Sequence, residues 1–510
     1  MSLISSFLQK VCDCLLRKGT LSLQDITRYA ELPSKVVENC LLVLIQHNCV
    51  QASNTLLEGG FGVAPRAVTQ YVIIFENILH RLRFSKFLSI VSEQHSAECV
   101  ELLKVLFQHG RLTLEQILSK KNQGMLVDFP GNPKAQDALR ASFGGLVEAH
   151  YIERCPTSEP YLAPFSEDNS LSTRTRGPKS AKLTGEIEAK EQGAIIAATP
   201  SETDRFSFIA DIGNDVVSEA ETGRNPANIL AGEKRKHDSV DMNTKTSAVV
   251  CEKKILWRAN FEEFVRRLRH KACVANVRTR LDGEAATILN AVLEVTWRAY
   301  RKVKTENSVP LSVEAILEEV MRSEGRIMTL EHVRAALDVL GCRPSTRGTD
   351  ESYSIDLKNI IEIAQNDEAE SIVLKRYGRN AYRVFRFLAK AGCLVHADKI
   401  SDGTFIEKKE TLKILYDLWK DDYLNMEKIT IQGSLQPQFL LWEVNRRSLR
   451  ELIFDEMYHA AINLSQRRDY EHEQERKLPL EKQAGAQGKI CVLESSLMKL
   501  DDALMLFHDF

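Results

Sequence analysis

The chain has 510 residues, which is too long for one ordinary hydrophobic core, so we expect several modules. Its 68 Lys and Arg residues balance 70 Asp and Glu residues, so any contact with nucleic acid must come from local basic patches. Aromatic residues make up only 7% of the chain, which argues against a stacking platform for single strands and against a β-rich fold.

Cysteine usage and hydropathy indicate an intracellular protein. None of the 11 cysteines forms a C-x-x-C pair, so the sequence predicts buried thiols in a reducing compartment rather than a zinc module. Lys10 and Asp13 interrupt the apolar start of the chain, so no signal peptide is expected. No stretch approaches the ~20 apolar residues of a membrane helix, and we therefore expect a soluble protein.

Sequence motifs of catalysis and cofactor binding are missing. The chain has no G-x-x-x-x-G-K-[ST], H-E-x-x-H, G-x-S-x-G or D-x-D-x-D-G sequence. Its 12 histidines show no metal-ligand spacing with cysteines or carboxylates. We expect a non-catalytic chain without cofactor or metal.

A short sequence motif is repeated along the chain. Residues 19–26 read Gly-Thr-Leu-Ser-Leu-Gln-Asp-Ile, and residues 110–117 read Gly-Arg-Leu-Thr-Leu-Glu-Gln-Ile. A third copy spans residues 311–316, and a degenerate fourth begins at Gly392, with Ile400 one residue out of step. In each good copy a hydroxyl residue is predicted to cap the next helix and an Ile to face the core. These pairs are Ser22 with Ile26, Thr113 with Ile117, and Ser312 with Ile316.

The helices that follow the motif share one sequence pattern at their C-terminal ends. Segments 35–50, 135–152 and 408–424 each have an apolar face, then a polar turn, then two residues that favour a strand. Helix, short strand, helix, turn, helix, strand is the order of a winged helix. Glu-Gly-Gly-Phe-Gly at residues 58–62 lies where the loop of the first wing is expected. One such unit is equally compatible with a small helical bundle, but several copies in register favour the winged helix.

The sequence thus predicts a mainly α fold with small β wings. It consists of four tandem winged helices and a C-terminal antiparallel coiled-coil hairpin. The predicted modules are winged helix 1 (residues 1–80), winged helix 2 (81–165), a disordered polar linker (166–250), winged helix 3 (251–365), winged helix 4 (366–445) and the helical hairpin (446–510).

The linker is predicted from its polar composition, which cannot bury enough surface to offset the entropy of ordering. Residues 234–237 within it read Lys-Arg-Lys-His, which is either a nuclear-import signal or a nucleic-acid contact. Such a short basic run is more often simply solvated.

Two apolar stripes near the C-terminus predict the hairpin. The first runs from Leu449 to Leu464, and the second has strict 4-3-4-3 spacing. Pro479, Gly485 and Gly488 lie between the stripes, so the second helix is expected to be short. The second stripe is a predicted interface, either with the first helix or with a partner, through Leu493, Leu497, Leu500, Leu504 and Phe507.

Two basic patches are candidate contact sites. Segment 253–281 holds nine Lys and Arg residues against two Glu, so it is predicted to contact DNA phosphates. The alternative is a helix whose arginines pack or pair within protein. The candidate DNA-binding residues are Arg258, Arg266, Arg267, Arg269, Lys271, Arg278 and Arg280. The second patch is a predicted protein interface, because aromatics at its spacing are more often core or interface than base-stacking: Arg81, Arg83, Phe84 and Phe87.

These features together resemble the third-largest subunit of DNA-directed RNA polymerase III, the family related to transcription factor IIE alpha. The similarity covers nearly the whole chain outside the linker. Its most specific stretches are residues 44–48 (Leu-Ile-Gln-His-Asn), 81–84 (Arg-Leu-Arg-Phe), 153–156 (Glu-Arg-Cys-Pro), 257–264 (Trp-Arg-Ala-Asn-Phe-Glu-Glu-Phe) and 376–386 (Arg-Tyr-Gly-Arg-Asn-Ala-Tyr-Arg-Val-Phe-Arg).

The resemblance implies a nuclear, non-catalytic subunit in a stable heterotrimer with two other polymerase III-specific subunits, docked on the clamp of the largest subunit. It also implies a role in promoter opening and initiation, with some contact to promoter DNA near the cleft. Polymerisation itself belongs to the two largest subunits.

Two other protein classes share parts of this pattern. A scaffold subunit of the proteasome-lid or cullin type usually carries one winged helix after a helical solenoid, and four spaced copies argue against it. A free-standing DNA-binding regulator needs a basic recognition helix. Residues 36–48, where the first such helix is predicted, contain no Arg or Lys.

Overall fold

A computed structural model describes most of the chain, in two compact units, Met1–Phe264 and Val265–Phe510. Within the described residues, no helix is long and apolar enough to cross a membrane. The structure describes residues 2–57, 66–124, 133–156, 161–162, 205–208, 255–299, 305–324, 328–342, 344–346, 351–430, 438–477 and 480–510.

The first winged helix has the order of elements that the repeat predicts. Its elements are α1 (Ser2–Lys18), β1 (Leu21–Ser22), α2 (Leu23–Ala30), α3 (Ser34–Gln46), β2 (Val50–Leu57) and β3 (Arg66–Ile73), followed by α4 (Phe75–His80) and η1 (Arg81–Arg83). β3 pairs antiparallel with both β1 and β2, and β5 (Tyr161–Leu162) extends the sheet parallel to β2. The predicted wing loop at residues 58–62 lies outside the described residues.

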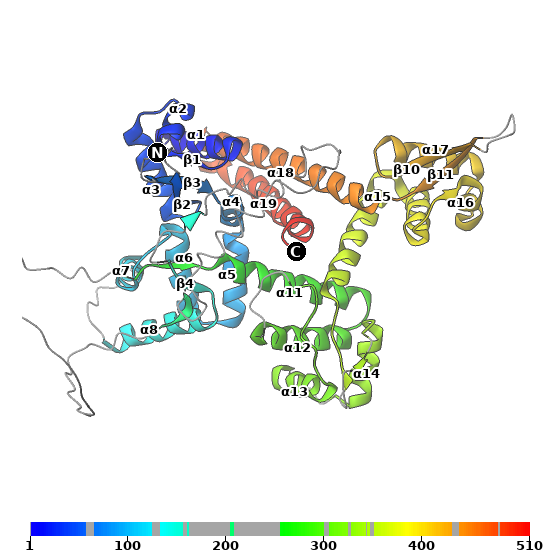
Figure 1. The fold of residues 1–510 in the computed structure, drawn as a ribbon, viewed down its shortest axis with the longest axis horizontal. Coiled ribbons are helices and arrows are strands. Elements are labelled where there is room, and N and C mark those ends of the chain that lie inside the picture. The colour runs from blue at the N-terminus through cyan, green and yellow to red at the C-terminus, as the bar shows by residue number, and fades with distance from the viewer. Residues whose placement is uncertain are drawn as a thin grey trace, which may run out of the picture. The chain divides into compact units, whose positions relative to one another are not determined.

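The second winged helix is completed by β6, a strand that follows the predicted polar linker (residues 166–250) in the sequence (Figure 1). Its elements are α5 (Phe84–Gln94), α6 (Ala97–His109), α7 (Leu114–Gly124), α8 (Pro133–Glu148), β4 (Ile152–Arg154) and β6 (Trp257–Ala259). β6 pairs antiparallel with β4, and Trp257 also bridges to Leu112. The predicted start of winged helix 3 at residue 251 is therefore corrected, because β6 is hydrogen-bonded into the second winged helix.

The third winged helix packs an unusually alanine-rich helix at its centre. Its elements are α11 (Phe261–Arg280), α12 (Gly283–Ala299), α13 (Val313–Glu324), α14 (Leu330–Val339), β7 (Ser345–Thr346) and β8 (Glu351–Ser352). Ala285, Ile288 and Leu289 of α12 are fully buried, and small side chains allow α13 and α14 to approach α12 closely. Leu311 supplies the short first strand by bridging Tyr353.

The fourth winged helix follows a long, kinked helix. Its elements are α15 (Leu357–Ala391), β9 (Val395–His396), α16 (Ala397–Thr404), α17 (Lys408–Lys420), β10 (Asn425–Thr430) and β11 (Gln438–Glu443). β11 lies between β10 and β9, and pairs antiparallel with both.

The kink in α15 occurs at Gly378, whose backbone has φ 86° and ψ −176°, a conformation that is essentially restricted to glycine. We expect Gly378→Ala to destabilise the second unit by about 1–3 kcal/mol in chemical denaturation, because alanine is strained there. The control is Gly488→Ala, in an exposed position of a regular helix with open space around it, which should stabilise by up to about 1 kcal/mol. Equal effects of the two substitutions would contradict the proposed strain at the kink.

Two long helices form the C-terminal hairpin, α18 (Arg446–Lys477) and α19 (Leu480–His508), which pack side by side (Figure 1). The prediction of a short second helix is wrong: α19 has 29 residues and contains both Gly485 and Gly488. Residues 478–479, between the two helices, lie outside the described residues. The predicted fold class, mainly α with small β wings and tandem winged helices, is confirmed.

The predicted helix caps are confirmed. Backbone N–H groups donate to the hydroxyls of Ser22, Thr113 and Ser312 at 3.2–3.3 Å. In the degenerate fourth copy the cap is His396, and Ile400 lies four residues later, as in the other copies. The extra residue therefore precedes the cap. The four core isoleucines are all buried: Ile26, Ile117, Ile316 and Ile400.

The turn after each recognition helix has the same geometry in all four copies. A residue with positive φ closes it, and the next residue donates its N–H to a carbonyl five residues earlier, at 2.8–3.0 Å. The copy in winged helix 3 was not predicted, because its strand-forming pair is weak in the sequence. The four positive-φ residues are Asn48, His150, Gly341 and Asp422.

One part of the predicted disordered linker is ordered. Residues 205–208 pack on the second winged helix, where Arg205 pairs with Glu153 and Phe208 contacts Phe143. A composition-based prediction missed them because four residues barely alter the average of a polar segment. The basic run at residues 234–237 lies outside the described residues.

Candidate protein and nucleic-acid interfaces

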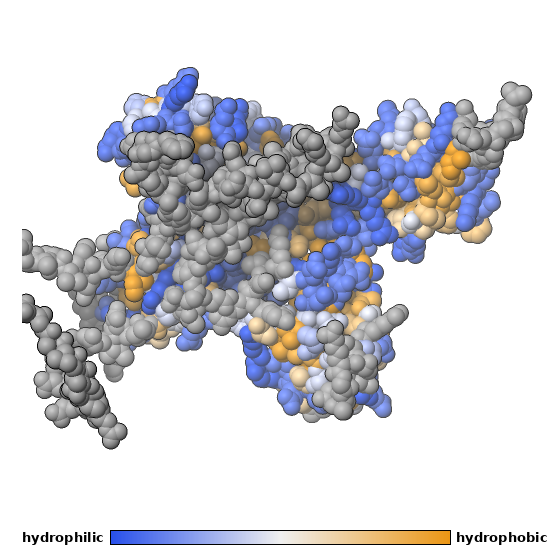
Figure 2. Space-filling model, viewed as in Figure 1, coloured by the Kyte–Doolittle hydropathy of each residue, from blue (hydrophilic) through white to orange (hydrophobic). Residues whose placement is uncertain are grey.

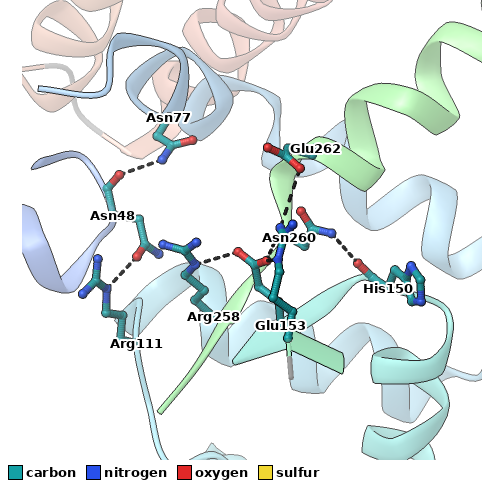
Figure 3. Close-up of polar contacts among 9 residues, drawn as sticks. Asn48, Asn77, Arg111, His150, Glu153, Arg258, Asn260 and Glu262 are labelled. Atoms are coloured by element: carbon teal, nitrogen blue, oxygen red, sulfur yellow. Dashed lines mark hydrogen bonds and ion pairs between the residues drawn. The ribbon is translucent and has the colours of Figure 1, made fainter. Parts of the chain in front are cut away.

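The end of α3 joins the first winged helix to the second. The carbonyl oxygen of Gln46 accepts the backbone N–H of Arg111 at 2.9 Å, and the Gln46 side-chain amide donates to the carbonyls of His109, at 3.0 Å, and Arg111. The Arg111 guanidinium donates through Nε to Oδ1 of Asn48 at 2.7 Å (Figure 3). The C-terminal end of the first recognition helix is therefore engaged within the protein.

The remaining surface of α3 is apolar rather than basic. Leu42 is 65% exposed and Val43 is 41% exposed, and both belong to the helix that would enter a DNA groove in a DNA-reading winged helix. Phosphates and base edges offer these side chains no polar contact, so this face suits a protein partner.

A buried carboxylate organises the sheet of the second winged helix. Oε1 of Glu153 accepts Nε of Arg258 at 2.6 Å, and Oε2 accepts Nε of Arg205 at 2.9 Å (Figure 3 shows Glu153 facing Arg258). Burial alone would raise the pKa of Glu153, but the two arginines outweigh it and hold that pKa below its ordinary value. The same carboxylate raises the pKa of Arg258 against the effect of burial.

Most of the predicted DNA-binding arginines contact protein instead. Arg258 is committed to Glu153, and Arg267 pairs with Glu294 at 2.9 Å while its guanidinium lies 4.2 Å from the ring of Trp297. Arg269 donates to the carbonyl of Thr305 at 2.9 Å. Phosphate contact by these side chains would require giving up buried partners.

Arg266 is also buried, 5.6 Å from the centre of the Trp297 ring. Burial lowers the pKa of the adjacent His270 to about 3, and the neighbouring arginines add to the shift. His270 is therefore neutral at physiological pH, and adds no positive charge to this part of α11.

Three candidates for DNA contact are exposed, all in the second half of α11. Lys271, Arg278 and Arg280 face solvent, and Arg280 lies 3.6 Å from Asp367 in a half-exposed ion pair. Because exposed ion pairs are weak, this one does not prevent a phosphate contact. The DNA-binding hypothesis is thus concentrated on the last three turns of α11.

The predicted interface just after the first winged helix is mostly core. Phe87 is fully buried, and Phe84 stacks on Phe107 with 4.3 Å between ring centres. Arg83 is buried near His80, whereas Arg81 is exposed and lies over Phe84. The interface prediction is corrected for Arg83 and Phe87, because neither side chain reaches the surface.

The C-terminal part of the predicted tail interface packs against other parts of the same chain. Leu504 is buried, and Leu500 and Phe507 pack against the core of the fourth winged helix. Leu493 and Leu497, farther from that core, are half-buried. The end of this stripe therefore closes on the chain's own fold.

The fourth winged helix presents another apolar face that the sequence reading did not assign to an interface. Leu412, Tyr416 and Trp419 on α17 are 40%, 54% and 37% exposed, at the spacing of one helix face. Phe405, at the end of α16, is 88% exposed. Figure 2 shows hydrophobic residues at the surface over the fourth winged helix.

The described residues contain no candidate metal centre. No group of three His, Cys, Asp or Glu residues among them could hold a metal ion. Ten cysteines are described, all as thiols, and Cys393 and Cys491 are exposed, so the prediction of buried thiols is wrong for these two. Burial raises the pKa of Cys273 and of Cys342 to about 11, which makes both unreactive at neutral pH.

Three family models match this chain. RNA polymerase III subunit RPC82 matches residues 141–364, its helix-turn-helix domain matches residues 6–55, and the C-terminal winged-helix domain of POLR3C matches residues 369–444. Together they span more than half of the chain. The chain belongs to the RNA polymerase III subunit RPC82 family.

Curated members of this family align along most of the chain. DNA-directed RNA polymerase III subunit RPC3 of Bos taurus is 22% identical over 500 residues, which cover 96% of this chain and 86% of the relative. The Homo sapiens protein is also 22% identical and has 85% of its length covered. The Dictyostelium discoideum protein is 21% identical over 590 residues, with 90% of this chain and 88% of the relative covered.

The stretches that resemble the RPC82 family now have structural roles. Gln46 and Asn48 form the joint between the first two winged helices, and Glu153 and Arg258 form the buried pair. Arg376 makes a bidentate ion pair with Glu456, with N–O distances of 2.8 and 3.1 Å. That pair links α15 to α18, and Glu456 carried no sequence signal because its partner is 80 residues away.

Proposed function

We propose that this chain is a peripheral, non-catalytic subunit of RNA polymerase III in the nucleus, and that it acts in promoter opening and initiation. In this proposal it forms a heterotrimer with two other polymerase III-specific subunits, docked on the clamp of the largest subunit. Membership of the RPC82 family over most of the chain is the observation that carries the proposal.

The winged helices serve mainly as protein-docking modules in this proposal. The exposed apolar faces of α3 and α17 support that role, because hydrophobic side chains exposed together favour partner proteins over phosphates. The same faces argue against a free-standing DNA-binding regulator, which needs basic recognition helices.

Affinity purification of the tagged chain from its own cells tests the assignment. We expect recovery of the largest polymerase III subunit and of two other polymerase III-specific subunits in stoichiometric amounts. Replacing both Leu42 and Tyr416 with Asp should reduce recovery of partners, while the chain remains folded by circular dichroism, because both side chains are exposed. Recovery of proteasome or ubiquitin-ligase subunits without polymerase would rule out the assignment.

DNA contact is assigned to Lys271, Arg278 and Arg280. We expect the triple charge reversal to Glu to weaken DNA retention by the assembled polymerase at least tenfold at low salt, and to flatten its salt dependence. Fluorescence anisotropy with a labelled promoter duplex at several salt concentrations measures both.

The matched control is the reversal of Lys10, Arg17 and Lys18 on α1, which are equally exposed and basic. This control should leave DNA retention unchanged. Equal binding by both triple variants and the unmodified chain, with subunit assembly intact, would make the α11 patch a protein interface instead.

A further inference from the structure

We propose that the second winged helix carries a peptide-binding site for an arginine-aromatic motif, and that residues 205–208 (Arg-Phe-Ser-Phe) are its ligand within the same chain. The site is formed by the end of α8, the turn at His150, and the strands β4 and β6. The inference is independent of the assignment to the polymerase, since it rests on contacts inside the first unit.

The arginine of the motif binds a buried carboxylate that Arg258 already holds in place. Glu153 is 4% exposed, and one of its oxygens is already bonded to Arg258. The other oxygen accepts two N–H groups of Arg205, through Nε at 2.9 Å and through Nη2. A second carboxylate, Glu262, lies 3.7 Å from the same guanidinium. A lysine could not reproduce the paired donation.

The first aromatic residue of the motif stacks on the partly buried turn at His150. The Phe206 ring lies 4.0 Å from the ring of His150 with 9° between their planes. His150 is held with φ 65°, and its carbonyl accepts the side-chain amide of Asn260 at 2.9 Å (Figure 3). The imidazole therefore projects from a fixed turn that offers a flat face to an aromatic ring.

The second aromatic residue enters a space between α8 and β6. Phe208 contacts Phe143, with 5.6 Å between ring centres, and Trp257, with 6.1 Å. The floor of this space is Gly144, where a Cβ would lie 3.2 Å from the Phe208 ring. Glycine at this position leaves room for the aromatic ring, so the site selects an aromatic two residues after the first.

The ligand is held by its tether as well as by its contacts. Residues 205–208 lie near the middle of the segment that connects β5 to β6, so binding anchors this segment to the second winged helix. A tethered ligand acts at an effective concentration of roughly millimolar, and thus a short motif of modest affinity can fill the site. A free peptide of the same sequence should bind only when the tethered copy is removed.

Binding of a fluorescein-labelled peptide spanning residues 201–212 to the full chain tests the proposal. The variant Arg205→Gln, Phe206→Ala, Phe208→Ala should bind the peptide, and the unmodified chain should bind it at least tenfold more weakly, measured by fluorescence anisotropy. A peptide with Glu in place of Arg205 should not bind. His150→Asn in the triple variant should weaken binding, since asparagine accepts the positive φ but lacks the ring.

Equal peptide binding by the triple variant and the unmodified chain, or no binding to a folded triple variant, would overturn the proposal. Amide hydrogen exchange covers the case in which the triple variant fails to fold. The single variant Phe206→Ala should then speed exchange at residues 205–208, whereas Phe405→Ala, at an exposed phenylalanine, should leave it unchanged. Unchanged exchange at residues 205–208 in Phe206→Ala would overturn the proposal as well.

Discussion

Gly110→Ala is expected to destabilise the first unit by about 3 kcal/mol or more in chemical denaturation. A Cβ at this position would lie 2.0 Å from the carbonyl oxygen of Gln46, so either the backbone of α3 moves or the joint opens. Opening the joint breaks the hydrogen bonds of Gln46 and of Asn48 with Arg111. The positive φ of 75° adds the ordinary strain of a non-glycine residue.

Gly19→Ala separates the cost of the steric contact with α3 from the cost of the positive φ. Gly19 stands at the same place in the first copy of the motif and has φ 81°, but no atom lies within 4 Å of its Cβ position. It should therefore show only the conformational cost, about 1 kcal/mol. If the two variants were destabilised equally, the close approach of Gly110 to α3 would not matter for stability, and the joint would be looser than the structure indicates.

The repeated parts of this fold could be predicted because their determinants are local. Ser22 and Ile26 are four residues apart, and their copies keep that spacing, so the cap and the core residue were identified without any knowledge of tertiary contacts. The same reasoning located the turn that contains Asn48, since a polar turn between an apolar helix and a strand is visible in the sequence.

The long-range side-chain contacts within the winged helices could not be predicted, because the partners lie far apart along the chain. Glu153 and Arg258 are 105 residues apart, and nothing near either residue signals the pairing. Reading the charge of segment 253–281 as a whole therefore counted Arg258 as a candidate for phosphate contact. Arg267 was also counted as a candidate for phosphate contact, although it pairs with Glu294 on the next helix.

The basic helix α11 has two halves with different roles. The first half of α11 uses its arginines to bind a carboxylate, a carbonyl and a tryptophan ring, and so it fixes structure. The exposed second half retains positive charge that can act on a partner. Charge and exposure have to be read together before a basic helix is assigned to DNA.

Glu153→Gln is expected to destabilise the first unit by about 3 kcal/mol at pH 7, because Arg258 loses its buried carboxylate partner and Arg205 is left with the more exposed Glu262, 3.7 Å away. Glu262→Gln is the control. Its carboxylate is 66% exposed and lies 3.7 Å from Arg205, so its loss should change stability by about 0.5 kcal/mol or less.

The effect of Glu153→Gln should also depend on pH in a defined direction. The folded pKa of Glu153 lies below its ordinary value of 4.5, so the unfolded chain binds the proton more readily. The stability from this carboxylate is therefore fully present above pH 4.5 and is lost as the pH falls through the lower folded pKa. Urea denaturation between pH 7 and pH 3 should show the difference between the two proteins shrinking only below pH 4.5. A difference that stayed constant over this range would mean that the charge of Glu153 does not hold β4 and β6 together.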